Sequence, residues 1–548
     1  MIADPPTAVP AESYVLPASY GQVRLWLLDQ AQLGGPVYNT VNPLRIRGAL
    51  DTARLRRALH TVVERHEVLR SVLRLQGADV VAVVHTRLDV PLDERDLAGR
   101  GGVDAIEEEI RRVAARPFDL AIGPLVRCHL LRVAADDHVL VVVIHHAIGD
   151  PRSSEILVGE LAAGYAADAD GADPRLPELP IQYPDFAAWQ RQAADAGAFD
   201  DALDRWRQRL AGVRPTELPA ELPPPDRRTA RAVTAPVVVP ADVLRRLRGL
   251  AGGVTPFMVA MAAYAALLGR WSGRDEVVVA LPADGRDQPE LRHVVGYFIN
   301  TLPVRVDLSG DPTFGELLGR VRAACLAAYA DAAVPFERIV EAAAPGRDVG
   351  RMPLAQAWLV VREPVALPRP AGLELTPVRI PPAYLPFDVA LSLTHDEGAL
   401  SGDLAAAADL ITPATVRQAA RRLAEMLAAV AGAPETRLSQ LPLLQPAVPP
   451  AQPIGDPWPV PPGEPADEPG GDDSAAVEQL LRRLWTEILE VDNVAADDEF
   501  YASGGNSLRA VRLVMQAREA GLELPMDVVL GEHTLRQLAD AATGTGGR

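Results

Sequence analysis

Residues 445–474 read QPAVPPAQPIGDPWPVPPGEPADEPGGDDS, and this stretch divides the chain more clearly than any other. It is rich in proline, glycine and acidic residues and has no hydrophobic periodicity, so it offers no face to bury against a core. This composition predicts an extended, semi-stiff linker. A chain that contains it should fold as two separate units, a large one before the linker and a small one after it.

The small unit, residues 475–543, has the pattern of a helical bundle. Its first segment, SAAVEQLLRRLWTEILEV, repeats apolar residues at the spacing of one helix face. The residues on that face are Val477, Leu480, Leu481, Leu484 and Ile488. A second helix is expected from Ser507 to Gly521 and a third over 534–542. About 70 residues lie near the lower limit for a domain that folds alone.

The large unit mixes strand and helix patterns. VLRSVLRL, HVLVVVIHH, EVVVALP and LAQAWLVV predict strands, and TARLRRALHTVVERH and TPFMVAMAAYAALLGRW predict amphipathic helices between them. A proline-rich stretch at 217–228 follows a helical pattern from Trp189 to Leu210, and it is a candidate crossover between two lobes. We therefore expect an α/β fold in two lobes, residues 12–180 and 181–444.

Charge and cysteine usage limit the class of partner. The net charge of −19 argues against nucleic acid and against an anionic membrane surface, because both need a basic face. No apolar run approaches the roughly 20 residues of a membrane span, and the N-terminus lacks the pattern of a signal peptide. Cys128 and Cys325 lie far apart in apolar contexts, which predicts buried free thiols and a cytoplasmic protein.

The segment IHHAIGD, residues 144–150, places two histidines and an aspartate at the end of the most apolar strand pattern. Neighbouring side chains on a strand point to opposite faces, so His145 and His146 should not share a cavity. This disfavours a metal site. A neutral imidazole facing a channel suits a base or a hydrogen-bond partner, with Asp150 ordering the turn. The alternative is two core histidines with satisfied hydrogen bonds and a turn aspartate.

The segment DEFYASGGNSL places a serine where the second helix of the small unit begins. Gly504 and Gly505 permit a tight turn, and Phe500 and Tyr501 anchor the loop before it. A helix N-terminus stabilises an attached phosphate, so Ser507 is well placed to carry a phosphodiester. The alternative is a serine that only caps the helix. The segment is not G-x-S-x-G and follows no strand, which argues against a hydrolase nucleophile.

Together these motifs resemble those of nonribosomal peptide synthetases. The large unit is similar to a condensation domain of the chloramphenicol-acetyltransferase-like fold, and the small unit is similar to a peptidyl carrier protein, which is a four-helix bundle. Apart from the carrier motif, the motifs in the family's order are SYGQVRLWLLDQ at 19–30, RHEVLRSVLR at 65–74, IHHAIGD at 144–150, YPDFAAWQ at 183–190, VGYFINTLPVR at 295–305, VPFERIVE at 334–341 and GRDVGRMPL at 346–354.

The resemblance implies a role for each residue of the histidine motif and its surroundings. His146 is implied as the catalytic residue, which accepts a proton from the attacking amine or holds that amine by a hydrogen bond. His145 is implied to be structural. Asp150 is implied to brace the loop by pairing with Arg65 or Arg70.

Three further positions are expected to line a tunnel between the lobes, namely Asn300, Gly149 and Pro151. The resemblance also implies that Ser507 carries 4′-phosphopantetheine as a covalent cofactor, and it implies no metal. The implied reaction is acyl or peptidyl transfer, giving an amide or an ester, from a donor carrier thioester to an acceptor on this chain's own carrier.

The implied partners are an upstream donor carrier protein, a phosphopantetheinyl transferase and a loading enzyme. No adenylation domain lies between the large and small units, so a separate adenylation enzyme, or another acyl-transferring partner, is expected to load the carrier.

Three positions depart from the family's histidine motif. Pro151 stands in place of a glycine, Gly149 in place of a serine and Arg152 in place of a tryptophan. Proline fixes φ near about −65°, and its ring narrows the space beside the donor arm. This keeps a second hypothesis open, a condensation-like platform that recruits tailoring or loading enzymes to the carrier-bound substrate. We expect an active enzyme, because the histidines, the aspartate and both arginines are present.

Overall fold

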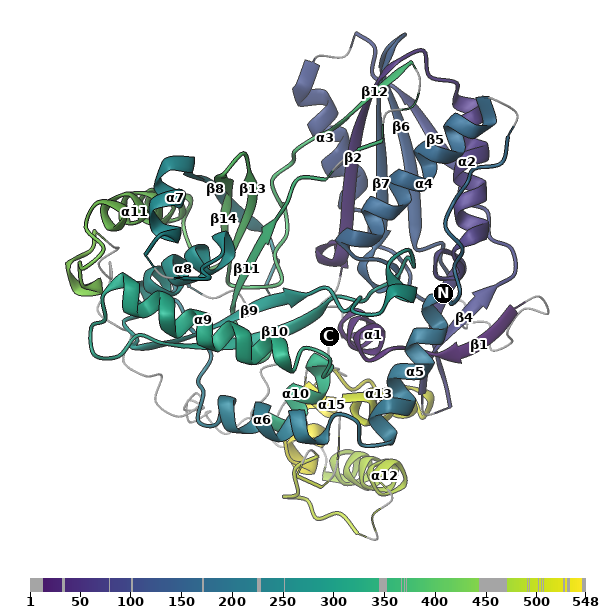
Figure 1. Cartoon of the computed structure of the whole chain (residues 1–548). Coiled ribbons are helices and arrows are strands. Elements are labelled where there is room, and N and C mark those ends of the chain that lie inside the picture. The colour runs from purple at the N-terminus through teal and green to yellow at the C-terminus, as the bar shows by residue number, and fades with distance from the viewer. Residues whose placement is uncertain are drawn as a thin grey trace.

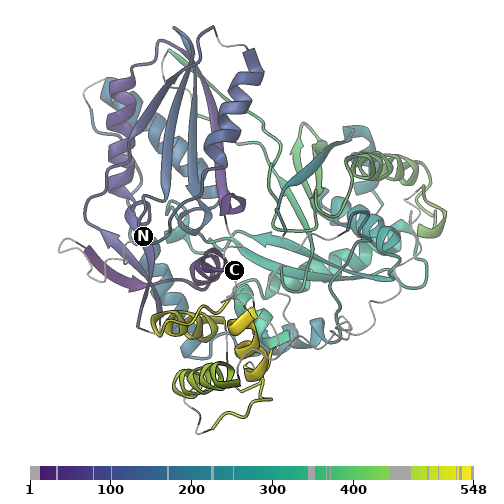
Figure 2. The ribbon, with the colours of Figure 1, turned by 180° about the vertical axis from the view of Figure 1, so that it is seen from behind.

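The computed structural model describes residues 13–442 and 471–544, except for positions 32–34, 78, 100–101, 170–171, 224–227, 251, 344–351, 366, 369, 371, 490, 492, 501, 504, 506, 526–527 and 530–532. Most of the predicted linker therefore lies outside the described residues, as does most of the motif at 346–354. The described part forms two lobes arranged as a V, with a helical bundle near the apex (Figures 1 and 2).

The N-terminal lobe is built on a five-stranded sheet. In sheet order its strands are β12 (Leu373–Pro377), β2 (Asn39–Gly48), β7 (Asp137–His145), β6 (Val126–Ala134) and β5 (Leu92–Asp96). The central strand β7 is buried from His138 to His145 because helices cover both of its faces. Leu140, Val142 and Ile144 pack toward α2 (Thr52–Arg65) and α4 (Pro151–Ala169), whereas the alternate residues pack toward α3 (Gly102–Ala114).

A second, smaller sheet closes this lobe and is formed by β1 (Ser13–Pro17), β4 (Asp79–His85) and β3 (Ser71–Gln76). The predicted strand VLRSVLRL is only partly a strand. Its first residues form a 3-10 helix, Glu67–Arg70, and β3 starts at Ser71. The reason is local, since α2 ends at Arg65 and the chain turns through the 3-10 helix before it extends.

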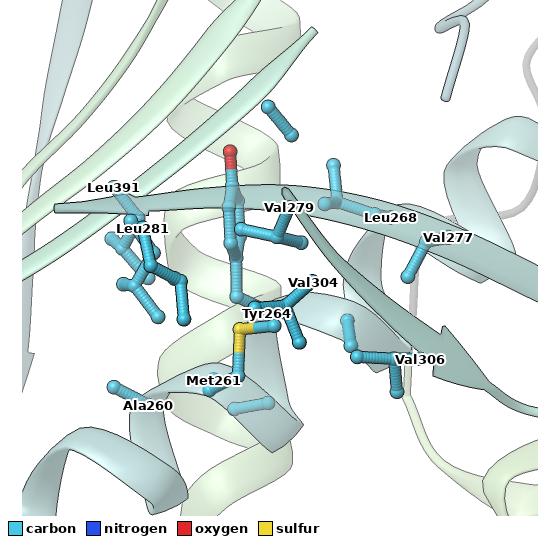
Figure 3. Close-up of a cluster of buried hydrophobic side chains, with 14 of the residues drawn as sticks. Ala260, Met261, Tyr264, Leu268, Val277, Val279, Leu281, Val304, Val306 and Leu391 are labelled. Carbon is cyan, nitrogen blue, oxygen red and sulfur yellow. The ribbon is translucent and has the colours of Figure 1, made fainter. Parts of the chain in front are cut away.

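The C-terminal lobe has a six-stranded sheet, in the order β10 (Asn300–Asp307), β9 (Glu276–Ala283), β11 (Ala357–Arg362), β13 (Val389–Asp396), β14 (Ala399–Ala407) and β8 (Ala232–Val239). The helices that pack on it are α7 (Ala241–Arg248), α8 (Pro256–Ser272), α9 (Phe314–Ala330) and α11 (Pro413–Gly432). Helix α8 is buried from Met258 to Gly269, and Figure 3 shows Met261 and Tyr264 beside Val279, Leu281 and Val304 of the sheet.

The two lobes share residues across the predicted boundary at 180/181. Strand β12 comes from the C-terminal part of the chain but pairs with β2 of the N-terminal sheet. Val294, Val295, Tyr297 and Phe298 likewise belong to the N-terminal core. A division at one point in the sequence is therefore too simple, because the second lobe sends a strand and a loop into the first.

Four helices lie where the lobes meet, namely α1 (Tyr20–Gln30), α5 (Tyr183–Asp195), α6 (Asp200–Leu210) and α10 (Phe336–Ala343). The helical pattern expected from Trp189 to Leu210 is interrupted between α5 and α6. Gly197 adopts a φ of 75° there, which is a left-handed conformation that favours glycine. Cys128 and Cys325 are both buried and free, as predicted.

The helical bundle contains α12 (Gly471–Leu489), α13 (Ser507–Glu519) and α15 (Leu535–Gly544) among its described residues. Leu481, Leu484 and Ile488 are buried, as the predicted helix face required, and the rings of Trp485 and Phe500 meet edge to face at 5.0 Å. The resemblance implied a fourth helix without placing it in the sequence, and of residues 526–532 the structure describes only 528–529. Within the described ranges, no helix combines the length and apolarity that crossing a bilayer requires.

Candidate active site

His145 is an internal residue at the end of β7. It is 3% exposed, its ring meets Phe118 edge to face at 6.1 Å, and its Nδ1 accepts a hydrogen bond from the Ala147 N–H at 3.1 Å. An accepting Nδ1 requires the neutral tautomer with the proton on Nε2. Burial, with smaller effects of His146 and Arg127, lowers the pKa of His145 to about 3.

This depressed pKa makes a prediction about stability. A histidine that is neutral when folded and titrates near 6.5 when unfolded stabilises the fold above pH 6.5, and that stability is lost as pH falls toward 3. We expect the free energy of unfolding to fall by up to about 1.4 kcal/mol per pH unit through this window. His145→Asn, whose Oδ1 can accept the same Ala147 N–H, should flatten the slope in urea titrations at pH 6.5 and 4.5.

The control for this prediction is His60→Asn on α2. The His60 side chain is 66% exposed, so its replacement should leave the free energy of unfolding at pH 6.5 close to that of the wild type. An unchanged slope in His145→Asn would contradict the assignment of a buried neutral imidazole.

His146 lies one residue further, at the start of a 3-10 helix, His146–Ile148. Its Nδ1 lies 2.8 Å from the Gly149 carbonyl oxygen and must therefore donate to it, which leaves Nε2 unprotonated in the neutral ring. Burial is the main cause that lowers the pKa of His146, against the raising effect of the Gly149 hydrogen bond and of Asp150. The result is a neutral imidazole with a free electron pair on Nε2 at neutral pH.

Asp150 joins the two lobes. Its Oδ1 accepts hydrogen bonds from the Ser153 N–H and hydroxyl, both at 2.8 Å, and from Arg286 Nη2 at 3.0 Å. Its Oδ2 accepts from Arg286 Nη1 at 2.7 Å and from the Phe298 N–H at 3.1 Å. Both members of the ion pair have side chains only 2% exposed. The carboxylate thus caps α4 and binds a C-terminal-lobe arginine at the same time.

The expectation that Asp150 pairs with Arg65 or Arg70 is wrong. Arg65 Nε donates to Glu160 Oε1 at 3.1 Å. Helix α2 packs beside α4, so Arg65 at the end of α2 reaches the middle of α4. Glu160 lies ten residues after Asp150, which is roughly 15 Å along the axis of α4. Arg70 donates instead to backbone carbonyls, including Val63 at 3.2 Å and Thr86 at 3.0 Å.

Sequence reasoning missed Arg286, the actual partner of Asp150. Its guanidinium also lies 4.2 Å from the centre of the Phe298 ring. The signal in the sequence is weak, an arginine between Asp284 and Asp287 just after a buried strand. Nothing in that spacing indicates a partner 136 residues away.

Pro151 is compatible with the geometry of the turn. It is the first residue of α4, where a helix leaves the backbone N–H unbonded and where the fixed φ of proline suits the chain. Gly149 fits tightly, because a Cβ there would lie 2.6 Å from Ile144 Cδ1. The proline therefore replaces the family's glycine without breaking the cap that Asp150 provides.

A cavity of about 580 Å³ lies between α1, α5, the loop after β9, and the start of β10. Asn300 lines it, while Gly149 and Pro151 are not among its lining residues in the described part of the chain. The polar atoms of Asn300 are engaged, since Nδ2 donates to the Ala332 and Val334 carbonyls at 2.9 and 2.6 Å and Oδ1 accepts from the Phe336 N–H at 3.0 Å. Its amide anchors the start of α10 beside the cavity.

In the helical bundle, α13 begins at Ser507 and has no acidic residue in its first turn. The preceding loop is tight. The Gly505 N–H bonds the Phe500 carbonyl at 2.9 Å, and a Cβ at Gly505 would lie 2.4 Å from Phe500 Cδ1. A tight loop before a helix N-terminus without nearby acids in its first turn fits a covalently attached phosphodiester.

The bundle contacts the N-terminal lobe through α13 and α1. Met515 of α13 packs against the N-terminal core, and Ala31, at the end of α1, packs against the core of the bundle. Figures 1 and 2 show the bundle near the apex of the V, on the side of α1. Helix α13, which begins at Ser507, therefore packs against α1, whose first residues line the cavity.

Fold and site define the class of protein, and the chain belongs to the condensation domain family. The model of that family matches residues 12–448, and a phosphopantetheine attachment site domain matches residues 479–542. The second domain is the site of covalent phosphopantetheine attachment.

The curated relatives are large peptide synthetases. The chain is 37% identical over 453 residues to phosphinothricin tripeptide synthetase PhsC of Streptomyces viridochromogenes, covering 79% of this chain and 41% of that protein. It is 38% identical over 445 residues to an isonitrile lipopeptide synthase of Mycobacterium tuberculosis, covering 78% of this chain and 18% of that protein. The chain thus spans less than half the length of either relative.

Solved structures share the fold. The X-domain from teicoplanin biosynthesis matches with a TM-score of 0.72 at 31% identity, covering 78% of this chain and 97% of that one. The same kind of domain in complex with OxyB matches with a TM-score of 0.71 at 30% identity, covering 80% and 99%. A four-domain nonribosomal peptide synthetase, AB3403, matches at 0.70 and 21% identity, covering 80% and 34%, and supports the fold alone.

Proposed function

We propose that the chain transfers an acyl or peptidyl group from a donor carrier thioester to an acceptor nucleophile held on its own carrier domain, forming an amide or an ester. The observation that carries this proposal is His146. Its Nδ1 is held by the Gly149 carbonyl and its Nε2 is left free, in a turn that a buried ion pair fixes between the lobes. That is the arrangement a proton acceptor or an amine-positioning group needs.

In the proposed reaction the protein supplies position and one basic atom. As the amine forms a C–N bond to the donor carbonyl, the C–S bond of the thioester breaks and the donor carrier's thiol leaves. His146 Nε2 accepts the proton, or the hydrogen bond, of the attacking amine, while the Gly149 carbonyl stabilises the ring if it becomes charged. Phosphopantetheine attached to Ser507 would supply a thiol on a long arm, which holds the acceptor as a thioester. Holding both reactants close together in one channel supplies a large part of the rate acceleration without any further catalytic group.

Loading in trans is part of the proposal. The two family matches leave only residues 449–478 between the condensation and carrier domains, which is too short for an adenylation domain. A separate adenylation enzyme would load the carrier after a phosphopantetheinyl transferase has modified Ser507, and an upstream donor carrier would deliver the other reactant.

The experiment is intact-protein mass spectrometry of the loaded carrier. With Ser507 carrying an aminoacyl-pantetheine arm and a donor carrier supplied, the wild type should gain the mass of the condensed product. His146→Ala should form it about 10²- to 10⁴-fold more slowly, the usual contribution of a positioned acid–base group. Equal rates in the two proteins would remove His146 from the mechanism.

A second function is favoured by one observation, the likeness to the X-domain structures at 30–31% identity, one of which is a complex with OxyB. In that case the lobes would recruit a tailoring enzyme to the carrier-bound substrate. If neither the wild type nor His146→Ala condenses any of a broad panel of donors and acceptors, the recruiting function is supported in place of catalysis.

A further inference from the structure

Tyr297 separates the cavity from His146. It is one of the cavity-lining residues, and the centre of its ring lies 4.8 Å from the imidazole of His146 in an edge-to-face contact. Among the described residues His146 itself does not line the cavity. The tyrosine ring, and not the imidazole, therefore forms the wall of the cavity on this side.

The ring is held in place from two helices. Arg24 of α1 donates from Nη2 to the Tyr297 hydroxyl at 2.7 Å, and its Nε lies 2.8 Å from Glu337 of α10. On the other side a Cβ at Gly21 would lie 2.5 Å from Tyr297 Cε1, so only glycine leaves room for the ring. Tyr297 is 7% exposed, and burial is the main cause that raises the pKa of its hydroxyl.

The cavity lies on the side of the molecule that the carrier occupies. Ser19, Gly21 and Arg24 of the α1 region line it, and α13 packs against α1. Within the proposed function, this cavity is the acceptor's branch of the channel.

We propose that Tyr297 is the gate of the acceptor branch, a positioning and specificity-determining residue clamped shut by Arg24. Rotation of its side chain breaks the hydrogen bond to Arg24 and joins the cavity to His146. In the closed position the ring shields Nε2 from the cavity. The gate opens at the cost of one charge-assisted hydrogen bond, and the size of the residue at position 297 limits which acceptors pass.

The test measures passage of the arm and does not depend on condensation. A phosphopantetheinyl transferase loads Ser507 from a coenzyme A analogue that carries a bromoacetamide in place of its thiol, and 3′,5′-ADP leaves. When the arm reaches His146, Nε2 displaces bromide, so an N–C bond forms, the C–Br bond breaks and bromide leaves, while the proton on Nδ1 stays. Proteolysis and tandem mass spectrometry then follow the rate at which the peptides containing Ser507 and His146 become linked.

We expect Tyr297→Phe to link roughly tenfold faster than the wild type, the population shift that losing one hydrogen bond to a charged group produces. Tyr297→Leu, which removes the ring, should be faster still. Tyr14→Phe is the matched control. Tyr14 lies on β1, is 39% exposed and is not among the described residues that line the cavity, so its change should leave the rate unaltered.

Equal rates in the wild type, Tyr297→Phe and Tyr297→Leu would overturn the gate, as would the lack of any link to His146 in all three. A parallel rise in alkylation of Cys325, a thiol with 0% exposure, would also overturn it by showing general loosening. If the order of rates holds while the wild type forms no condensed product, the gate stands and the proposed function falls.

Discussion

Replacing Asp150 with alanine should lower the free energy of unfolding by about 3–5 kcal/mol, the usual result of removing one member of a buried ion pair. The buried Arg286 guanidinium would keep only the exposed carboxylate of Asp284, whose Oδ1 lies 3.0 Å from its Nη1, and the Ser153 and Phe298 N–H groups would lose their acceptor. Urea titration followed by tryptophan fluorescence measures the loss. Condensation should fall as well, because Asp150 orders the turn that carries His146.

A double-mutant cycle separates the ion pair from the rest of the network. Arg286→Met alone should also lower the free energy of unfolding. The double variant Asp150→Ala/Arg286→Met should lose less than the sum of the two single losses, because no buried charge is then left unpaired. Asp168→Ala is the control on the same helix. Asp168 pairs with Arg57 on the surface, with side chains 26% and 58% exposed, so little change is expected. If the losses of the two single variants add up in the double variant, Asp150 and Arg286 are not coupled.

Ser507→Ala should abolish attachment of phosphopantetheine altogether. Alanine has no oxygen to form the phosphodiester, so incubation with coenzyme A and a phosphopantetheinyl transferase should leave the intact mass unchanged. Every product that remains on the carrier should disappear with it. The fold should persist, because the described core of the bundle is built mainly from apolar side chains of α12, α13 and α15 that the substitution leaves unchanged.

The control for this prediction is Ser503→Ala in the same loop. The Ser503 hydroxyl donates to the Glu499 carbonyl at 2.9 Å, and the variant should still gain the full mass of the arm. Modification of Ser507→Ala, or loss of modification in Ser503→Ala with the bundle folded, would contradict the assignment of Ser507 as the attachment site.

The parts of the fold that follow from local pattern could be predicted from the sequence. The apolar run of β7, the helix stripe of α2 and the buried face of α12 each depend on residues close together in the chain, and the structure places them as expected. The family motifs likewise predicted the condensation and carrier domains, which the family matches confirm.

The contacts between the lobes could not be predicted in this way. The pairing of Asp150 with Arg286, the addition of β12 to the N-terminal sheet and the position of Tyr297 against His146 all depend on how distant segments pack. The family resemblance implied Arg65 or Arg70 as the partner of Asp150, but Arg65 bonds Glu160, which lies further along α4 from the turn.

The buried contacts around Asp150 determine how the two lobes can move relative to each other. Asp150 and Ser153, at the start of α4, bind Arg286, Gly296 and Phe298 of the loop that the second lobe sends into the N-terminal core, and these residues are buried. Moving the lobes apart would pull this loop out of the core and expose the whole cluster at once. We therefore expect the V to behave as a rigid frame, so that substrates are admitted by rotation of individual side chains and by travel of the tethered carrier.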